Sequence, residues 1–279
     1  AAPSQTARAP DNYQLDMLHS VVWSRTSAEA EAVHLQTFET ARRTLDAALA
    51  DKTWTAATEQ IGNFSQLPPA VVVDVDETVL DTSDYMVERA RLGKAFDKAS
   101  WNAYVQNENA PPIPGALKYL QYAASKGVTV FYVSNREVQV GEFKDEVEPT
   151  RKNLAKLGFP NTADSKTFIF RDSARGWKDK SPRRAEIAKT HRIVQMVGDN
   201  LYDLIDVPNA TRVSRDAAVE ARIDWLGTRW FVLPNPMYGS WETVITQGAS
   251  GSEARRLKLE SIGVPGALAD VIANGGFEK

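Results

Sequence analysis

Apolar runs and helical stretches alternate along the middle of the chain. Short runs rich in β-branched and aromatic residues predict five strands, at 70–75, 128–134, 167–170, 193–197 and 229–233. Helices are predicted between them, at 114–126, 148–157 and 181–190. Because the strands are apolar throughout and alternate with helices, we expect a parallel sheet covered by helices on both faces. The predicted fold class is therefore α/β, with three layers.

A long helix is predicted before the first strand, over residues 26–51. Thr26 and Glu29 have the spacing of a capping box. Apolar side chains recur at three- and four-residue steps and form one stripe: His34, Phe38, Ala41, Leu45 and Ala48. A shorter helix is predicted over residues 13–23, after a polar, Pro-containing start that is typical of a flexible leader.

Residues 86–112 do not fit the alternation. This stretch is polar, helical in places and rich in large aromatic residues, and we interpret it as an insertion near the edge of the sheet at which open α/β sheets bind ligands. The predicted division has four parts: a leader (1–12), N-terminal helices of a small helical cap domain (13–67), a core with the insertion (68–235), and a C-terminal segment that packs on the helical domain (236–279).

The composition narrows the classes of function. The chain is 43% hydrophobic and 25% charged, as in ordinary globular proteins. A net charge of −3 gives no sign of a surface for a nucleic acid polymer, and no apolar run approaches the roughly 20 residues of a membrane span. The absence of cysteine excludes disulfides and thiolate chemistry. None of the three histidines lies in a motif, which argues against hydrolases that use a reactive imidazole.

Carboxylates follow two of the predicted strands directly. In "AVVVDVDETVLDTSDY", Asp74 and Asp76 come at the end of the apolar strand that opens the string, and Asp199 and Asp203 follow the strand at 193–197. Burying such groups costs several kcal/mol each without a partner. Because parallel strands end at one edge of a sheet, the two clusters could converge on one metal ion, and hard oxygen ligands suit Mg²⁺. The simpler alternative is that these residues only end strands and form turns.

Donors and cations follow the other strands. The strand at 128–134 ends in Ser134 and Asn135, and "WKDKSPRR" supplies Lys178 and Lys180. Such groups would complement a phosphate, and the two lysines are rivals for that role because they lie in one short loop. Taken alone, the serine could be a helix cap and each lysine a solvated side chain.

Four motifs in order resemble those of the haloacid dehalogenase (HAD) phosphatase superfamily: "DVDET", "VSNR", the lysine of "DKS" and "GDNLYD". The longer strings "FYVSNR", "VGDNLYDL" and "LPNPMYGSWE" are similar to bacterial class C acid phosphatases of the lipoprotein e (P4)-like group. The resemblance covers about residues 15–245. It implies a Rossmann-like three-layer HAD core and hydrolysis of small phosphomonoesters with Mg²⁺ as cofactor.

The resemblance also implies residue roles. Asp74 would be the nucleophile that forms an aspartyl-phosphate, and Asp76 the general acid and base. Mg²⁺ would be held by Asp74, Asp199 and the main-chain carbonyl of Asp76. Ser134, Asn135 and Lys180 would bind the phosphoryl group, with Asp203 behind them orienting a metal-bound water or the lysine.

Selectivity is expected from two aromatic residues, Trp101 in the insertion and Tyr238 after the last strand. In the class C family, residues at these positions stack on the leaving group, notably the base of a nucleoside 5′-monophosphate; the alternative is that both only pack in the core. Two other functions stay open: phosphotransfer to an alcohol, and a catalytically weak storage or binding protein on the same fold. The resemblance also suggests a homodimer.

The location is inferred from the first residues. An Ala-Ala start resembles the product of signal-peptide cleavage, although an arbitrary boundary would look the same. The lipoprotein members carry a lipidated cysteine, and this sequence has no cysteine. A periplasmic or secreted form without a lipid anchor is therefore expected.

Overall fold

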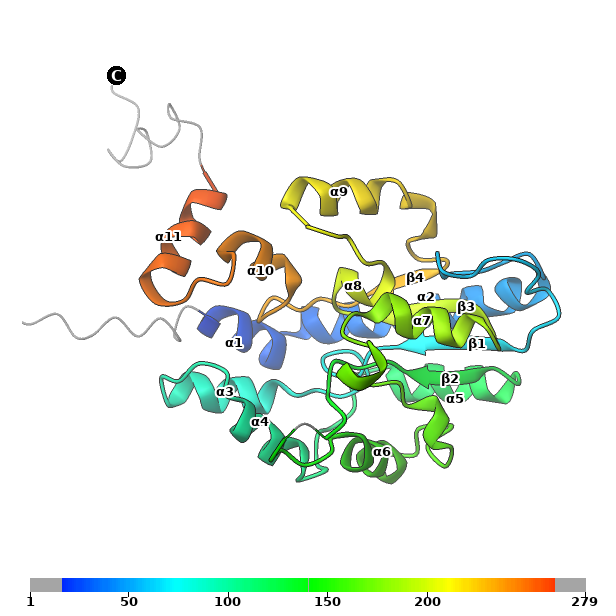
Figure 1. Cartoon of the computed structure of the whole chain (residues 1–279), viewed down its shortest axis with the longest axis horizontal. Coiled ribbons are helices and arrows are strands. Elements are labelled where there is room, and N and C mark those ends of the chain that lie inside the picture. The colour runs from blue at the N-terminus through cyan, green and yellow to red at the C-terminus, as the bar shows by residue number, and fades with distance from the viewer. Residues whose placement is uncertain (1–16, 140, 264–279) are drawn as a thin grey trace, which may run out of the picture.

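The computed structural model describes residues 17–139 and 141–263 (Figure 1). The predicted leader, the start of the helix predicted from residue 13 and the last part of the C-terminal segment lie outside these ranges. Among the described residues, no helix combines the length and apolar character needed to cross a membrane.

Four parallel strands form the sheet, in the order β2-β1-β3-β4. Their bounds are β1 Pro69–Val73, β2 Thr129–Tyr132, β3 Arg192–Gly198 and β4 Trp230–Val232. The two central strands, β1 and β3, are apolar along nearly their whole length and almost fully buried. A parallel sheet with this strand order and helices on both faces confirms the predicted α/β fold class (Figure 1).

The strand predicted at 167–170, one of five, was wrong. This segment reaches the edge of β2 only through a single bridge between Phe168 and Tyr132, and the amide of Ile169 donates to the carbonyl of Tyr132 at 2.9 Å. A short 3₁₀ helix, Ser165–Thr167, immediately before it leaves too few extended residues for a ladder. Its apolar side chains are buried against β2 nevertheless, and for this reason the segment resembles a strand in the sequence.

The α-helices of the described chain lie before, between and after the strands. Their bounds are α1 Leu18–Thr26, α2 Ala28–Ala50, α3 Ser83–Arg91, α4 Lys98–Val105, α5 Ala116–Ser125, α6 Val147–Lys156, α7 Lys180–Ala188, α8 Leu201–Leu204, α9 Arg212–Glu220, α10 Ser240–Thr246 and α11 Gly251–Ser261.

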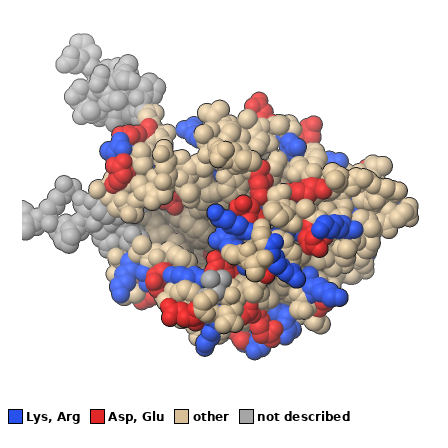
Figure 2. Space-filling model, in the orientation of Figure 1, with Lys and Arg blue, Asp and Glu red and all other residues tan. Residues whose placement is uncertain are grey.

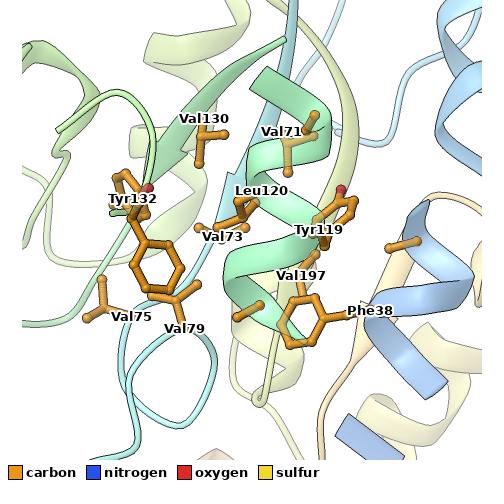
Figure 3. Packing of buried hydrophobic residues seen from close by; sticks show 14 of the residues in the cluster. Phe38, Val71, Val73, Val75, Val79, Tyr119, Leu120, Val130, Tyr132 and Val197 are labelled. Carbon is orange, nitrogen blue, oxygen red and sulfur yellow. The ribbon is translucent and has the colours of Figure 1, made fainter. Parts of the chain in front are cut away.

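The two faces of the sheet are covered by different helices. Alternate residues of β1 point to opposite faces: Val71 and Val73 pack with α2 and α5 (Figure 3), whereas Val72 packs in a second cluster with side chains of α7 and α8. Continuous apolar strands are needed because both faces are buried in this way.

The helix α2 differs from the prediction in two respects. Its N-cap is Ser27, whose hydroxyl accepts from the amide of Ala30 at 3.1 Å, because Thr26 still belongs to α1 and donates to its own helix. The predicted stripe is buried, but it covers the sheet: Leu45 and Phe38, the latter labelled in Figure 3, belong to the same cluster as β1. This helix therefore packs on the sheet and contributes to the same buried cluster as β1.

The insertion after β1 forms α3 and α4, and α1 packs on α3. In the C-terminal segment α10 packs on both α9 and α11. Figure 1 shows α1, α3, α4, α10 and α11 beyond the carboxyl ends of the strands. The division into a core and a cap domain stays a prediction. The insertion lies at the carboxyl ends of the strands, the same edge of the sheet as the acidic motifs.

Candidate active site

Asp74 is the first residue after β1, and its place follows from the pairing of the central strands. Val73 pairs with Val197 of β3 and with Tyr132 of β2. The amide of Asp74 donates to the carbonyl of Val197 at 3.0 Å. The residues that follow all three strands therefore meet at one edge of the sheet.

The side chain of Asp203 packs directly against the backbone of Gly198, the last residue of β3. A Cβ atom at Gly198 would lie 2.3 Å from both Cβ and Oδ2 of Asp203, so only glycine fits at that position. The carboxylate of Asp203 accepts from the amide of Asn200 at 2.8 Å and closes a capping box at the start of α8. The turn after β3 thus brings Asp203 back toward Asp199.

Three carboxylates gather at this edge, from Asp74, Asp199 and Asp203. One oxygen from each lies within 4.8 Å of the others. Burial raises the pKa of Asp199 to about 7 and raises the pKa of Asp74 well above its usual range, and the neighbouring carboxylates add to both shifts. Buried carboxylates that repel one another fit a divalent cation, because its charge would offset the repulsion.

From the sequence, the main-chain carbonyl of Asp76 was expected to be a metal ligand. In the structure, the side chain that completes the carboxylate cluster belongs to Asp203. The residues expected at the metal, Asp74 and Asp199, both belong to this group. Hard oxygen donors of this kind are those that Mg²⁺ and related divalent cations prefer.

Lys180 lies in the middle of the cluster. Its Nζ donates to Asp74, lies 2.6 Å from Oδ1 of Asp203, and its side chain is only 3% exposed. Burial acts to lower the pKa of Lys180, but the two carboxylates outweigh it and the net shift is upward. The rival residue, Lys178, is exposed. The structure thus places Lys180, and not Lys178, beside the carboxylates.

Asp76 is held by an arginine that sequence reasoning did not assign to the site. Arg136 Nε and Nη2 lie 3.1 and 2.8 Å from Oδ1 of Asp76, and Nη1 donates to Thr150 at 2.7 Å. The Arg136 side chain is 2% exposed and its guanidinium lies 5.6 Å from the ring centre of Trp101. A buried ion pair of this geometry fixes the position of the carboxylate.

The turn after β2 places Ser134 and Asn135 differently. Ser134 is fully buried and its hydroxyl accepts from the amide of Arg136 at 3.0 Å, whereas Asn135 faces the cavity above the sheet. Arg183 of α7 supports both, since it donates to the carbonyl of Ser134 and to Oδ1 of Asn135 at 2.7 Å. The same helix begins with Lys180, so one element positions the lysine and the turn.

A cavity of about 420 Å³ opens above these residues. Asp74, Asp76, Asp199 and Asp203 line its polar end. Aromatic side chains line another part of it: Tyr85, Phe96, Trp101 and Tyr238. Figure 2 shows a hollow on this face, with basic and acidic side chains gathered at one end of it. The two aromatic residues singled out in the sequence therefore reach the same cavity as Asp74.

Trp101 contacts other aromatic rings as well as the cavity. Its ring centre lies 5.1 Å from that of Tyr85 in an edge-on arrangement and 5.5 Å from that of Tyr104. Both Trp101 and Tyr238 are partly exposed. They can thus contact a bound group and support the wall of the cavity at once.

Two residues that hold Asp199 were also missed. Thr78 donates to Oδ1 of Asp199 at 3.0 Å, and Asn235 donates to Oδ2 at 2.9 Å. Thr78 is the last residue of "DVDET", so the motif contained the signal although no role was assigned to it. Asn235 lies in "LPNPMYG", where only the structure shows that the side chain turns toward the acidic cluster.

Comparison with known proteins adds a family to this geometry. A family model described as HAD superfamily, subfamily IIIB (acid phosphatase), matches residues 4–241. The structure is similar to that of the class C acid phosphatase from Bacillus anthracis, with a TM-score of 0.79 and 29% identity, over 91% of this chain and 99% of that one. A structure of the Bacillus anthracis enzyme with tungstate bound matches with the same TM-score and 28% identity.

Two plant proteins are similar over part of their length. Acid phosphatase 1 of Solanum lycopersicum is 29% identical over 172 residues, and the stem 31 kDa glycoprotein of Glycine max is 26% identical over 172 residues. Each match covers 60% of this chain, and it spans 57% and 58% of the two plant proteins.

Proposed function

Because the chain belongs to subfamily IIIB of the HAD superfamily, the acid phosphatases, we propose that it hydrolyses small phosphomonoesters with the help of a divalent metal ion, Mg²⁺ by preference. The observation that carries this proposal is the position of Asp74. Its carboxylate lines the cavity and accepts a hydrogen bond from Lys180. Two further carboxylates, of Asp199 and Asp203, lie close to it.

Asp74 would act as the nucleophile. One of its oxygens attacks phosphorus, the bond from phosphorus to the ester oxygen breaks, and an aspartyl-phosphate forms on Asp74. A carboxylate is a poor attacker of a dianion unless nearby positive charge offsets the repulsion. Lys180 supplies one such charge, and Asn135 lines the same end of the cavity as a neutral donor.

Asp76 would move the proton in both halves of the reaction. It donates a proton to the leaving oxygen and then accepts one from the water that attacks the aspartyl-phosphate, which releases phosphate and restores Asp74. Arg136 would keep the carboxylate of Asp76 directed toward the cavity. Ser134 would act through the turn that it stabilises as well as through any contact with a phosphoryl oxygen.

The metal ion, when bound, would neutralise charge on the phosphoryl group. Asp74 and Asp199 would hold it, with the carbonyl of Asp76 as the third protein ligand. Thr78 and Asn235 fix the orientation of the Asp199 carboxylate through its two oxygens. Asp203 would keep Lys180 charged and in place.

Nucleoside 5′-monophosphates and aryl phosphates are the substrates we propose, since aromatic side chains line the cavity beside Asp74. Stacking on a base is worth roughly 1–3 kcal/mol and tolerates any base. The similar Bacillus anthracis enzyme has been solved with tungstate bound, and tungstate has the tetrahedral shape of phosphate, which supports a phosphate ester as the substrate. A homodimer and a periplasmic or secreted location stay predictions.

Two alternatives make different use of the same residues. A phosphotransferase would pass the phosphoryl group from Asp74 to an alcohol, and a storage or binding protein would not turn over. The presence of Asp74, Lys180 and the acidic cluster together favours catalysis.

Hydrolysis of p-nitrophenyl phosphate with and without Mg²⁺ tests the proposal. We expect activity that EDTA abolishes and Mg²⁺ restores, and a loss of several orders of magnitude in Asp74→Asn with the fold retained. Release of phosphate in the presence of an alcohol, compared with release of nitrophenol, separates hydrolysis from transfer. Full activity after exhaustive chelation, or in Asp74→Asn, would contradict the proposal.

A further inference from the structure

A short row of charged side chains lines the cavity next to its acidic end. Arg171, Glu137 and Lys98 all face the cavity. Nη1 of Arg171 lies 3.6 Å from Oε1 of Glu137, and Nζ of Lys98 lies 3.2 Å from Oε2 of the same carboxylate. None of these residues has a role in the proposed reaction.

Three cationic side chains line this cavity, and they differ in the number and length of their ion pairs and hydrogen bonds. Lys98 pairs with the buried carboxylate of Glu146 at 2.9 Å, and Arg136 is held by Asp76 and Thr150. The Arg171 guanidinium makes no hydrogen bond with any residue in 17–139 and 141–263, and its contact with Glu137 is too long for one. Its side chain is 37% exposed, so this cation can still bind a group in the cavity.

The row lies on, or directly beside, the segments that also bring Asn135 and Trp101 to the cavity. Arg171 follows the extended segment beside β2, and Lys98 is the first residue of α4. Trp101 lies one turn further along α4 and lines the same cavity. The row therefore runs from the turn after β2 to the aromatic wall, while Lys180 already occupies the position beside Asp74. A group held by Arg171 and Glu137 would belong to the part of the substrate between phosphate and aromatic ring.

The charges of the row decide which group fits. Two carboxylates, of Glu137 and Glu146, balance the two cations Lys98 and Arg171. A second anion placed on Arg171 would also lie near Glu137, and at similar distances repulsion cancels attraction. A hydroxyl group meets both needs, because it can donate to the carboxylate and accept from the guanidinium. The carboxylate of Glu137 has acceptor capacity left after its contact with Lys98.

We propose that Glu137 and Arg171 recognise the sugar hydroxyls of the leaving group, so that the enzyme prefers ribonucleotides to their deoxy analogues. This inference rests on the proposed nucleotide substrates and adds a selectivity that aromatic stacking does not supply. A polar pair built to bind a hydroxyl discriminates against the analogue that lacks it, because the pair is then left unsatisfied.

The test compares AMP, 2′,3′-dideoxy-AMP, adenosine 3′,5′-bisphosphate and p-nitrophenyl phosphate as substrates. We expect kcat/KM for AMP to exceed that for the dideoxy analogue by about tenfold or more, since hydrogen bonds to charged groups are among the stronger ones. In Glu137→Gln and Arg171→Gln this ratio should fall to about threefold or less. Activity on p-nitrophenyl phosphate should stay within about threefold of the unaltered protein. Glu142→Gln and Lys178→Gln, which change exposed residues outside the cavity, should alter nothing.

Three results would overturn the inference. Equal kcat/KM for AMP and the dideoxy analogue would show that no hydroxyl is recognised. A loss in Arg171→Gln that is as large on p-nitrophenyl phosphate as on AMP would place Arg171 at the reacting phosphoryl group. A bisphosphate preferred over AMP would mean that Arg171 binds a second anion.

Binding separates this inference from the proposed function. Calorimetry on Asp74→Asn measures the affinity for AMP and for the dideoxy analogue without turnover, so the ratio is obtained even if the protein proves inactive. Hydrolysis of both nucleotides at equal rates contradicts only the hydroxyl recognition. If the protein hydrolyses p-nitrophenyl phosphate but Asp74→Asn binds neither nucleotide, the proposed nucleotide substrates and this inference are both wrong, while the phosphatase activity stands.

Discussion

The ammonium group of Lys180 lies between two carboxylates, donating to Asp74 and lying 2.6 Å from Oδ1 of Asp203. All three side chains are largely buried, so the charges interact with little screening by water. Asp203 has a second anchor in the amide of Asn200. Asp203 therefore fixes the position of the lysine. The other contact of the lysine is with Asp74, at which we expect the reaction to occur.

Replacing this lysine should therefore affect catalysis more than binding. In Lys180→Met we expect kcat to fall by about a hundredfold or more, because the developing charge loses a preorganised cation. Lys178→Met, two residues away and exposed, should keep nearly full activity. Steady-state kinetics on p-nitrophenyl phosphate measure both, with circular dichroism to establish that the fold is retained. Similar losses in the two variants would mean that the position of Lys180 is not what matters.

The leaving group should reveal the part played by Asp76. Asp76→Asn removes the proton donor, which an alkyl leaving group needs and nitrophenolate hardly needs. We expect the variant to lose at least about tenfold more kcat/KM on glycerol phosphate than on p-nitrophenyl phosphate. Arg136→Lys keeps the charge but not the two-point contact, and it should show the same pattern to a smaller extent. Equal losses on both substrates would count against Asp76 as the acid.

Much of this arrangement could be predicted because the strands impose it. Residues after parallel strands meet at one edge, so the meeting of Asp74 and Asp199 could be inferred from the predicted strands. Lys180 instead begins α7, after a segment that forms no strand, and only the family resemblance favoured it over Lys178. The pairing of Arg136 with Asp76 could not be inferred, because it depends on how the turn after β2 directs a side chain. Nor could the pattern of apolar residues show which surface a helix covers: the stripe on α2 is real, but it packs on the sheet.

The apolar run at 167–170 illustrates the same limit. Burial of Phe168 and Phe170 requires apolar residues there, whether or not a strand forms. Secondary structure was decided by the short helix before the run and the turn that begins at Asp172. Neither changes the apolar pattern by which the segment was assigned.

The acidic cluster should make the stability of the protein depend on pH and metal together. The folded state keeps the proton of Asp199 up to about pH 7, whereas an unfolded carboxyl group releases it near its ordinary pKa of 3.8. The folded state therefore binds more protons between these values, and without metal its stability should fall as pH rises through this range. A divalent cation offsets the repulsion, so it should stabilise the protein most at higher pH.

Calorimetric melting tests this directly. Adding Mg²⁺ to protein treated with EDTA should raise Tm by several degrees at about pH 8 and by less at about pH 5, because protons compete for the carboxylates. Asp199→Asn should weaken the dependence of Tm on pH and remove most of the response to Mg²⁺. An effect of Mg²⁺ that is equal at both pH values, or unchanged in the variant, would show that the cation binds elsewhere.

The aromatic wall provides the sharpest distinction between binding and packing. Trp101 and Tyr238 line the cavity, but Trp101 also contacts Tyr85 and Tyr104, so either residue could serve mainly to support the wall. If they stack on a base, Trp101→Ala and Tyr238→Ala should each lower kcat/KM on AMP by about tenfold or more and leave glycerol phosphate nearly unaffected, since only the nucleotide has a ring to stack. Tyr104→Ala offers a matched control, because this residue contacts Trp101 without lining the cavity. It should lower Tm while preserving the preference for AMP over the aliphatic ester. If the three variants instead lose activity equally on both substrates, in proportion to their loss of Tm, the wall acts only in packing and the proposed nucleotide preference loses its support.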